Sequence, residues 1–283
     1  MLHFLTIFFH KKQICLFSPI SLSECEIRKP YLLEREGISD GTAIMLAVPY
    51  FTKACLSPDR NVSAYAVSRD YHEFYGELFG ELLPLLREKY PEERFAGFAD
   101  HSPIAELQAA ARAGLGVIGR NGLLITRQYS SYVFLGELVT TAKLPSAVGP
   151  IRECIGCGKC RRACPMGEIG DCLSALTQKK GTLTDVEQKH LLRYRSAWGC
   201  DICQEVCPHT VAAIQTGSIF TPIPYFRENA IPRLSLSVLD SMDDQTFSQR
   251  AYAWRGRDTI RRNLTLLETQ ETVFGKGDDE CST

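Results

Sequence analysis

The chain has 283 residues, 12 cysteines and a formal net charge of −1 at pH 7. This length allows one large domain or two smaller ones. The balanced charge excludes a protein that attracts nucleic acid or membrane through a global field, although local basic patches stay open. In a short secreted chain so many cysteines would predict disulfides, but most of them here have metal-ligand spacings, which indicates a reducing, cytoplasmic compartment.

The first residues, MLHFLTIFFHKKQICLF, form an apolar run that is too short to span a bilayer. Lys11 and Lys12 follow this run rather than precede it, and no small-residue cleavage site is evident. We interpret residues 1–13 as a ragged or over-extended start in preference to a signal peptide. No other stretch is long and apolar enough for a membrane helix, so no membrane partner is expected.

Strand and helix signals are mixed in the first half of the chain. The apolar run GTAIMLAVPYF, which ends near Pro49, predicts a buried strand. Residues 68–90 have apolar side chains at helical spacing and predict an amphipathic helix with an irregularity at Pro84. Because strands and helices do not alternate strictly, we expect an α+β fold and not a doubly wound sheet.

Two further segments precede the cysteine-rich region. SPIAELQAAARAGLG predicts a helix with Ser102 as its N-cap, Pro103 in the first turn and a glycine stop. NGLLITRQYSSYVFLGELVTT predicts two strands joined by a polar turn, which would form a hairpin. The glycine-rich GLGVIGRNG between them follows a helix, which is the wrong context for a dinucleotide-binding turn. It is either a helix stop followed by a turn or a loop that approaches a planar cofactor.

We expect three consecutive domains: residues 1–147, 148–215 and 216–283. LPSAVGP reads as a linker before the second, which holds the clustered cysteines. The third has three prolines and then helical patterns near 236–251 and 256–268. Its last residues, GKGDDECST, are expected to fray.

Seven cysteines fall into two closely spaced groups. The first reads Cys154-x2-Cys157-x2-Cys160-x3-Cys164-Pro165, and the second reads Cys200-x2-Cys203-x3-Cys207-Pro208. This is the spacing of bacterial ferredoxins, in which three thiolates hold one four-iron cluster and the fourth cysteine ligates the other cluster. The pattern therefore predicts two [4Fe-4S] clusters.

The crossover rule assigns ligands to each cluster. Cluster 1 takes Cys154, Cys157, Cys160 and Cys207, whereas cluster 2 keeps Cys164, Cys200 and Cys203 and needs one more ligand. Cys172 is the only other cysteine in this region, so eight thiolates complete both clusters. Structural zinc is the alternative, but zinc sites usually have two separated pairs. The scattered cysteines, Cys15, Cys25, Cys55 and Cys281, are expected to be ordinary thiols.

Several motifs outside the cysteines resemble those of one family. AVPYF, SAYAVSRDYHEFY, FADHSPIAELQAAARAGLGVIGRNGLLI, SSYVFLGELVT and WGCDICQEVCP resemble the epoxyqueuosine reductases, cobalamin-dependent enzymes of tRNA queuosine synthesis. The resemblance runs from about Pro30 to Cys207 in the family's order, with a weaker echo in IRRNLTLLE. The family also places a cysteine like Cys172 between the two groups.

The resemblance implies a fold and a reaction. An N-terminal domain, related to nitroreductase-like cobalamin-processing proteins, would hold cobalamin, a two-cluster ferredoxin-like domain would pass it electrons, and a short helical extension would follow. The epoxide of epoxyqueuosine in tRNA would then be reduced to give queuosine. A carboxylic acid supplies the proton, and Asp100 in FADHSP matches it. The residues alone would favour a plain helix-start carboxylate at Asp100.

The resemblance also implies contacts and partners. The expected cobalamin contacts are Ser63, Tyr65, Asp100, Arg120, Asn121, Ser131 and Tyr132. Basic residues cluster at 159–162, 179–180, 193–195 and 255–262, where they could lie on a solvated face, bind tRNA phosphates or dock an acidic electron donor such as flavodoxin or ferredoxin.

The chain departs from the family pattern in three places. Leu107 stands where an arginine is expected, Arg120-Asn121 replaces Lys-Asn, and we expect a short form that lacks the family's C-terminal helical-repeat domain. Two alternatives therefore stay open beside epoxyqueuosine reduction. One is a cobalamin-dependent reductase of another substrate, and the other is a ferredoxin-like electron carrier without catalysis of its own.

Overall fold

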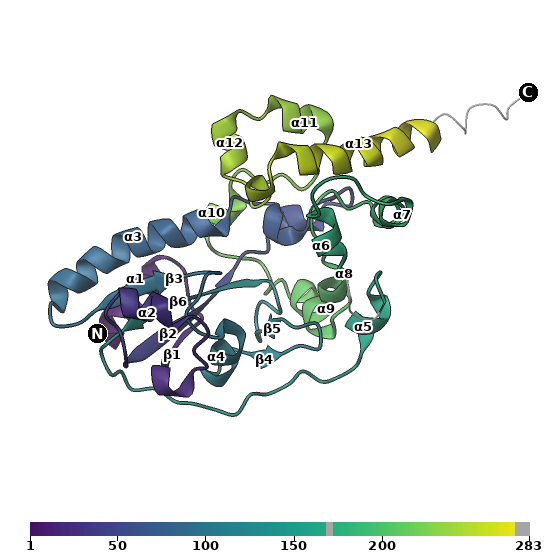
Figure 1. The fold of residues 1–283 in the computed structure, drawn as a ribbon. Helices are drawn as coiled ribbons and strands as arrows, with labels where there is room; N and C mark the ends of the chain where they lie inside the picture. Colours follow the sequence, from purple (N-terminus) through teal and green to yellow (C-terminus); the bar gives the residue numbers. More distant parts are fainter. Residues whose placement is uncertain (168–171, 275–283) are drawn as a thin grey trace, which may run out of the picture. The chain divides into compact units, whose positions relative to one another are not determined.

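The computed structural model describes residues 1–167 and 172–274 (Figure 1). Two compact units share the chain, and each is assembled from three separate segments. Unit 1 comprises Met1–Phe51, Tyr71–Gly158 and Cys207–Arg227, and unit 2 comprises Thr52–Asp70, Lys159–Val206 and Glu228–Thr283. These units are interleaved along the chain. The three consecutive domains expected from the sequence stay a prediction.

An antiparallel sheet lies at the centre of unit 1 (Figure 1). Its strands follow the order β1 (Phe17–Ser21), β2 (Thr42–Pro49), β6 (Val133–Thr140) and β3 (Phe95–Phe98). Every residue of β2 is buried, which confirms the strand predicted from its continuous apolar run. The sheet and the helices that follow show the mixed α+β fold that the sequence predicts.

Six α-helices belong to the described part of unit 1. They are α1 (Leu2–Lys11), α2 (Pro30–Arg35), α3 (Tyr71–Lys89), α4 (Glu106–Arg112), α9 (Pro208–Gln215) and α10 (Pro224–Arg227). The predicted amphipathic helix is confirmed as α3, which continues through Pro84. Within the segment interpreted as a ragged or over-extended start, residues 2–11 form α1, which buries Leu5 and Phe9 completely.

Two local predictions in unit 1 are also wrong. Helix α4 begins at Glu106 with Ala105 as its N-cap, so Ser102 does not cap it. The expected hairpin of residues 121–141 does not form either. Strand β5 (Leu124–Ile125) pairs with β4 (Val117–Ile118), whereas β6 pairs with β2 and β3. The glycine stop is confirmed, because Gly114 follows α4 with a φ of +84°.

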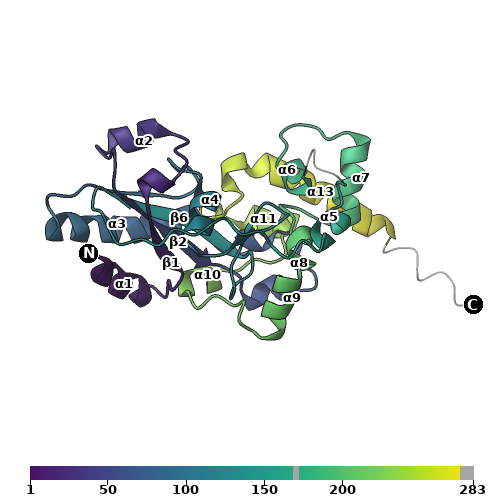
Figure 2. The same cartoon turned by 90° about the horizontal axis from the view of Figure 1, so that it is seen from below.

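Unit 2 is built from helices, most of which are short (Figure 2). They are α5 (Lys159–Ala163), α6 (Leu173–Thr177), α7 (Asp185–Tyr194), α8 (Ile202–Glu205), α11 (Leu236–Ser241), α12 (Asp244–Ser248) and α13 (Arg257–Phe274). One-turn 3-10 helices occur at Leu22–Glu24 in unit 1 and at Lys53–Leu56, Ala64–Ala66 and Ala253–Arg255 in unit 2. Helices α11, α12 and α13 confirm the helical patterns predicted for the last third of the chain. The segment GKGDDECST lies outside the described residues.

A buried amide helps to hold helix α13 in unit 2. The side chain of Asn263 donates hydrogen bonds to the carbonyl oxygens of Thr177 and Ala197, both at 2.8 Å. Leu264 and Ile260 on the same helix are fully buried. Helix α13, near the end of the described residues, therefore fixes the backbone at Thr177 and at Ala197. Over residues 1–167 and 172–274, no helix combines the length and the apolar character that a membrane span needs.

Candidate functional site

The four cysteines assigned to cluster 2 all belong to unit 2. Burial, together with smaller contributions from the charges of Asp201, Cys172 and Cys164, raises the pKa of the Cys200 thiol to about 11. Burial likewise raises the pKa of Cys203 to about 12, with smaller contributions from the charges of Cys200, Cys172, Asp201 and Cys160. Thiolates repel one another in this way only at short range. The fold of unit 2 therefore brings Cys172 near Cys200 and Cys203, and it also brings Cys160, which is assigned to cluster 1, near Cys203.

Such a set of thiols suits a polynuclear iron cluster. Bound metal ions deprotonate coordinating thiols, so the cluster would remove the repulsion that raises these pKa values. Each cysteine of a cubane ligates a different iron, and the four sulfurs need not converge on one point. Within the described residues, no three His, Cys, Asp or Glu side chains converge on a site for a single metal ion. The ligand assignment itself stays a prediction.

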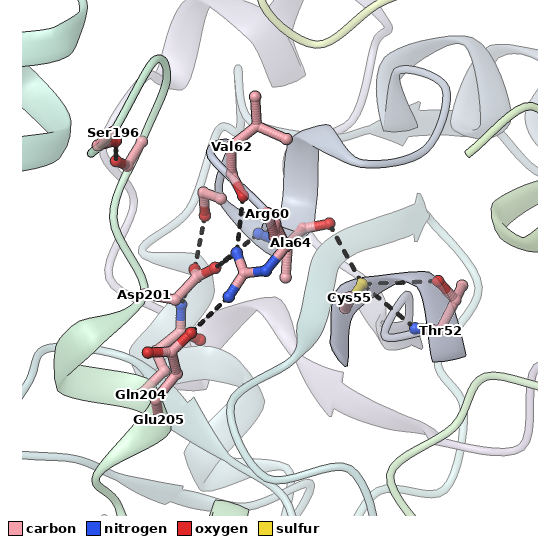
Figure 3. A network of polar contacts seen from close by, with 11 residues as sticks. Thr52, Cys55, Arg60, Val62, Ala64, Ser196, Asp201, Gln204 and Glu205 are labelled. Carbon is pink, nitrogen blue, oxygen red and sulfur yellow. Dashed lines mark hydrogen bonds and ion pairs between the residues drawn. The ribbon is translucent and has the colours of Figure 1, made fainter. Parts of the chain in front are cut away.

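A buried carboxylate fixes the loop between Cys200 and Cys203 (Figure 3). Asp201 is 4% exposed and accepts four hydrogen bonds. The donors are Arg60 Nη1 at 2.6 Å, Ser63 Oγ at 2.5 Å, the backbone N–H of Ala64 at 2.6 Å and Gln204 Nε2 at 3.1 Å. Because these donors come from residues 60–64 and from α8, the loop that carries the two cysteines is held from both sides.

Arg60 is the centre of this network. It also pairs with Glu205 and donates to the carbonyl oxygen of Val62 at 2.7 Å (Figure 3). Burial by itself would lower the pKa of Arg60, but the charges of Asp201 and Glu205 reverse that effect and raise it. Sequence patterns gave no direct signal for this pairing, since Arg60 and Asp201 lie 141 residues apart. The only hint was an acidic residue directly after Cys200.

We expect Arg60→Met to destabilise the Cys200–Cys203 loop. Removing one partner of a buried ion pair leaves the other charge unpaired and typically costs about 3–5 kcal/mol. Anaerobically purified variant protein should lose iron and show a lower unfolding temperature. Arg35→Met is the matched control, because the Arg35–Glu36 pair is exposed and exposed pairs contribute about 0–1 kcal/mol. Equal iron content and stability in the two variants would show that the network does not support the cluster loop.

The first cysteine segment is attached to the β4–β5 hairpin of unit 1. The backbone N–H of Cys154 donates to the carbonyl oxygen of Ile118 at 3.0 Å, and Ile118 N–H donates to Arg152 O at 2.8 Å. Gly156 has a φ of +68°, and a side chain there would start 3.4 Å from Arg120 Nη2. The exposed Arg120, predicted as a cobalamin contact, thus lies beside the Cys154–Cys157 loop. Its positive charge there would offset the negative charge of a bound cluster.

Cys207 and Cys160 lie at the starts of helices. Cys207 is the N-cap of α9, and Pro208 takes the first helical position, where its missing N–H and fixed φ are tolerated. Helix α9 is held within unit 1 by a 2.7 Å hydrogen bond between the hydroxyls of Thr210 and Ser130. Cys160 is the second residue of α5 in unit 2.

Asp100 lies on the loop between β3 and α4. It has a φ of +63°, a left-handed conformation that is uncommon for a residue other than glycine and is enriched at functional sites. Its side chain is 68% exposed, and Oδ2 lies 3.6 Å from His72 Nε2. Phe98 and Ile104, which lie near Asp100 in the sequence, are buried in the core of unit 1. Asp100 is therefore strained in its backbone and accessible in its side chain.

The adjacent His101 has a structural explanation. Its Nδ1 lies 3.1 Å from Lys29 Nζ, and its Nε2 lies 3.0 Å from Tyr31 Oη. Both ring nitrogens are occupied by neighbours on the surface of unit 1. This arrangement favours the structural interpretation of His101 over a catalytic one.

The other expected cobalamin contacts differ in exposure. Ser131 and Tyr132 are buried, and the Tyr132 ring packs against Phe51 with centroids 4.5 Å apart. Asn121 is half-buried, and its Oδ1 accepts from the N–H of Leu123 at 3.4 Å. In unit 2, Ser63 is buried and donates to Asp201, and burial raises the pKa of Tyr65. Among these predicted contacts, Asp100 and Arg120 present the most exposed side chains.

Much of the basic region near the C-terminus has structural partners. Arg257 donates to the carbonyl oxygens of Leu239, at 2.9 Å, and Met242, at 2.8 Å. Arg261 pairs with Asp240 at 2.5 Å. Arg262 donates to the carbonyl oxygens of Lys179 and Gly181, both at 2.6 Å. These three arginines hold unit 2 together, so they are poor candidates for phosphate contacts.

Two carboxyl groups beneath the Asp100 loop were not singled out in the sequence. Glu137 occupies the middle of β6 and is fully buried, and its Oε1 accepts a hydrogen bond from Ser102 Oγ at 2.5 Å. Glu106 is the first residue of α4. Burial is the main cause that raises the pKa of both groups. A single acidic residue within the apolar run VFLGELVT was the only signal for Glu137.

Comparison with known proteins identifies the cysteine region. Residues 153–211 match the family model of the 4Fe-4S dicluster domain. This match covers both cysteine groups and Cys172. It supports the assignment of this chain to the iron–sulfur proteins.

Relatives with named activity match most of the chain. An epoxyqueuosine reductase of Listeria monocytogenes is 33% identical over 215 residues, which cover 70% of this chain and 54% of the relative. The chain thus spans about half the length of this relative. An epoxyqueuosine reductase of a Synechocystis strain is 32% identical over 235 residues, covering 78% of this chain and 81% of the relative.

Solved structures agree in fold. The epoxyqueuosine reductase of Streptococcus thermophilus superposes with a TM-score of 0.75 at 24% identity, covering 94% of this chain and 80% of that one. Another epoxyqueuosine reductase, crystallised with an epoxyqueuosine-modified tRNA stem loop, gives a TM-score of 0.71 at 24% identity, with 94% and 81% covered. Together with the sequence identities, these matches lead to one conclusion: the chain belongs to the epoxyqueuosine reductase family.

Proposed function

We propose that this protein reduces epoxyqueuosine to queuosine in tRNA, using two [4Fe-4S] clusters and cobalamin. The observation that carries the proposal is the 32% identity that extends over 81% of a full relative with this named activity. A solved family member bound to a modified tRNA stem loop supports tRNA as the substrate class. The same proposal includes a nitroreductase-like domain in the N-terminal part of the chain that binds cobalamin.

The predicted ligands of the clusters have the chemistry that the clusters need, whereas only some of the predicted cobalamin contacts are exposed. Thiolates are the ligands that iron–sulfur clusters require, and the predicted ligands Cys164, Cys172, Cys200 and Cys203 all belong to unit 2. For cobalamin, Asp100 and Arg120 are exposed enough to reach a large cofactor, whereas Ser131 and Tyr132 are buried. When bound, the clusters supply single electrons and cobalamin supplies the metal-centred reduction chemistry.

Asp100 takes the role of the acid in this proposal. Conversion of an epoxide to an alkene with loss of its oxygen as water consumes two electrons and two protons. Negative charge develops on the oxygen as each C–O bond breaks, and a positioned acid that neutralises this charge typically contributes about 10²–10⁴-fold in rate. The accessible carboxyl of Asp100, fixed on a strained loop, suits this step. The second proton then comes from solvent.

Exposed basic residues supply a route to tRNA and to an electron donor. Lys159, Arg161 and Arg162 lie exposed on α5 or at its start, close in sequence to the predicted ligands. Arg193 and Arg195 are also exposed, and with Arg233 they line a cavity of about 800 Å³ in unit 2. Positive side chains of this kind suit phosphate groups or an acidic donor such as flavodoxin.

Anaerobic reconstitution with iron, sulfide and cobalamin, followed by an assay on tRNA that carries epoxyqueuosine, tests the proposal. A ferredoxin-like carrier would assemble the clusters but would not bind cobalamin. A cobalamin-dependent reductase of another substrate would bind both groups and leave the tRNA unchanged. Formation of queuosine separates the proposed function from both alternatives.

A further inference from the structure

Two carboxyl groups meet on the buried side of the Asp100 loop. Glu137 lies between Leu135 and Val139, which belong to the apolar core that packs against α4. Because side chains alternate along a strand, Glu137 faces the same side as these two residues, toward α4. Glu106 opens α4 and makes a side-chain hydrogen bond with Glu137. All of these residues belong to unit 1.

This contact requires a proton between the two groups. Glu106 Oε1 and Glu137 Oε2 are buried and receive no hydrogen bond from any conventional donor in the described part of the chain. Two carboxylates cannot hydrogen-bond to each other, whereas a carboxylic acid can donate to a carboxylate. Burial and the charge of Glu106 raise the pKa of Glu137 well above its ordinary value. Glu137 therefore holds the proton and donates it toward Glu106, and the two groups titrate as a pair.

The pair is connected to Asp100 through the backbone. The N–H of Asp100 donates a hydrogen bond to the Glu106 carboxylate. Asp100 has a left-handed φ of +63°, a conformation that persists only where its surroundings hold it. Ser102, two residues further on, is held by its 2.5 Å bond to Glu137 and by a 3.0 Å bond from the N–H of Ile104. Both ends of the short loop are thus tied to the same carboxyl pair.

We propose that Glu106 and Glu137 are positioning residues for Asp100, and that one proton shared between them holds the Asp100 loop in its left-handed conformation. The proposal rests on the proposed function, in which Asp100 is the acid. Loss of the shared proton would place two negative charges side by side in a buried setting. The pair would then separate, and the acceptor for the Asp100 N–H would move.

Substitutions separate the roles of the two side chains. In Glu137→Gln, the amide N–H can replace the shared proton and the amide oxygen can accept from Ser102, so near-normal turnover is expected. Glu106→Ala removes the acceptor of the Asp100 N–H. We expect its kcat to fall about 10- to 100-fold with KM for tRNA unchanged, because small misplacements of a reacting group are costly. Glu106→Gln, which keeps an acceptor oxygen, should recover most of the loss.

An infrared measurement tests the shared proton without any assay of activity. At neutral pH, the wild-type protein should show the C=O stretch of a protonated carboxylic acid, which a carboxylate does not have. Glu137→Gln should remove this band. A wild-type protein without the band, or a variant that retains it, would overturn the shared proton.

The pH dependence of stability provides an independent check. Because Glu137 keeps its proton to higher pH in the folded state than in the unfolded state, the folded state binds more protons above about pH 4.3. The free energy of unfolding contributed by this group is therefore full below that pH and is lost as the pH rises toward the raised folded pKa. Glu137→Gln should flatten this decline.

The charged groups that face the pair are few. Asp100 and Lys29 act on Glu106, and Tyr75 and Cys25 lie within the field of Glu137. Burial raises the pKa of Tyr75, and it raises that of Cys25 to about 11, so neither ionises near neutral pH. The part of the decline in the free energy of unfolding with rising pH that Glu137→Gln removes therefore comes from the Glu106–Glu137 pair.

The outcomes distinguish this proposal from the proposed function. Normal turnover in Glu106→Ala would overturn the positioning role, even with Asp100 confirmed as the acid. Conversely, normal turnover in Asp100→Asn would overturn the acid, whereas the infrared band would still report the shared proton. If Glu106→Ala fails to fold, the kcat of Glu106→Gln and the infrared spectrum of Glu137→Gln still decide the question.

Discussion

Asp100→Asn is expected to bind cobalamin and assemble both clusters normally, yet lose about 10²–10⁴-fold in turnover. Asparagine keeps the shape of aspartate and much of its hydrogen bonding, and it also tolerates the left-handed conformation seen at position 100. It cannot deliver a proton at the breaking C–O bond. Anaerobic single-turnover kinetics on modified tRNA measure the loss, and the visible spectra of the clusters and cobalamin check the cofactors.

His101→Gln is the matched control for this substitution. The His101 ring contacts Lys29 and Tyr31 on the surface, so its loss should change turnover far less than the change at Asp100. Wild-type turnover in Asp100→Asn with intact cofactors would show that the proton comes from another group. Equal losses in both variants would point to a general disturbance of the loop.

Cys172→Ala should lower the iron content from about eight to about four per chain, because one four-iron cluster loses a ligand. The residue caps α6, directly before the buried Leu173, so its position is fixed by the core of unit 2. Iron analysis and the electron paramagnetic resonance spectrum of the reduced protein measure the change. Turnover should fall with it, since electrons would reach the cofactor through an incomplete chain.

Cys15→Ala is the control for the loss of a thiol. Cys15 and Cys172 are both exposed, but Cys15 lies far from the ligand pattern in sequence. Its substitution should leave the iron content and the reduced spectrum unchanged. Full iron content and an unaltered spectrum in Cys172→Ala would mean that another group completes the second cluster.

Local patterns predicted the elements whose structure depends on local causes. The continuous apolar run of β2 and the helical spacing of α3 each reflect burial of the element's own side chains. The predictions that were wrong concern residues whose structure depends on partners far away in the sequence. Ser102 has the composition of an N-cap, but its hydroxyl bonds to Glu137, 35 residues away. Strand β6 pairs with β2, whose paired residues lie 84 to 98 positions earlier, instead of folding back on β5.

The candidate site shows the same division. Cysteine spacing is a local property of the chain, so it predicted the iron–sulfur region that the dicluster match confirms. The groups that hold the site in place are not local. Arg60 reaches Asp201 across the chain, and Glu137 meets Glu106 only because β6 packs against α4. Their single-residue signals, an acid beside a cysteine and an acid in an apolar strand, have no meaning until the fold is known.

The most direct test of the account is the conversion of epoxyqueuosine to queuosine in tRNA by the anaerobically reconstituted chain, measured by mass spectrometry of the digested nucleosides. The account predicts queuosine in an amount that exceeds the protein. It should depend on iron, on cobalamin and on a low-potential reductant, and Asp100→Asn should lose most of it. Unchanged epoxyqueuosine in the presence of protein that holds both clusters and cobalamin would contradict the proposed function.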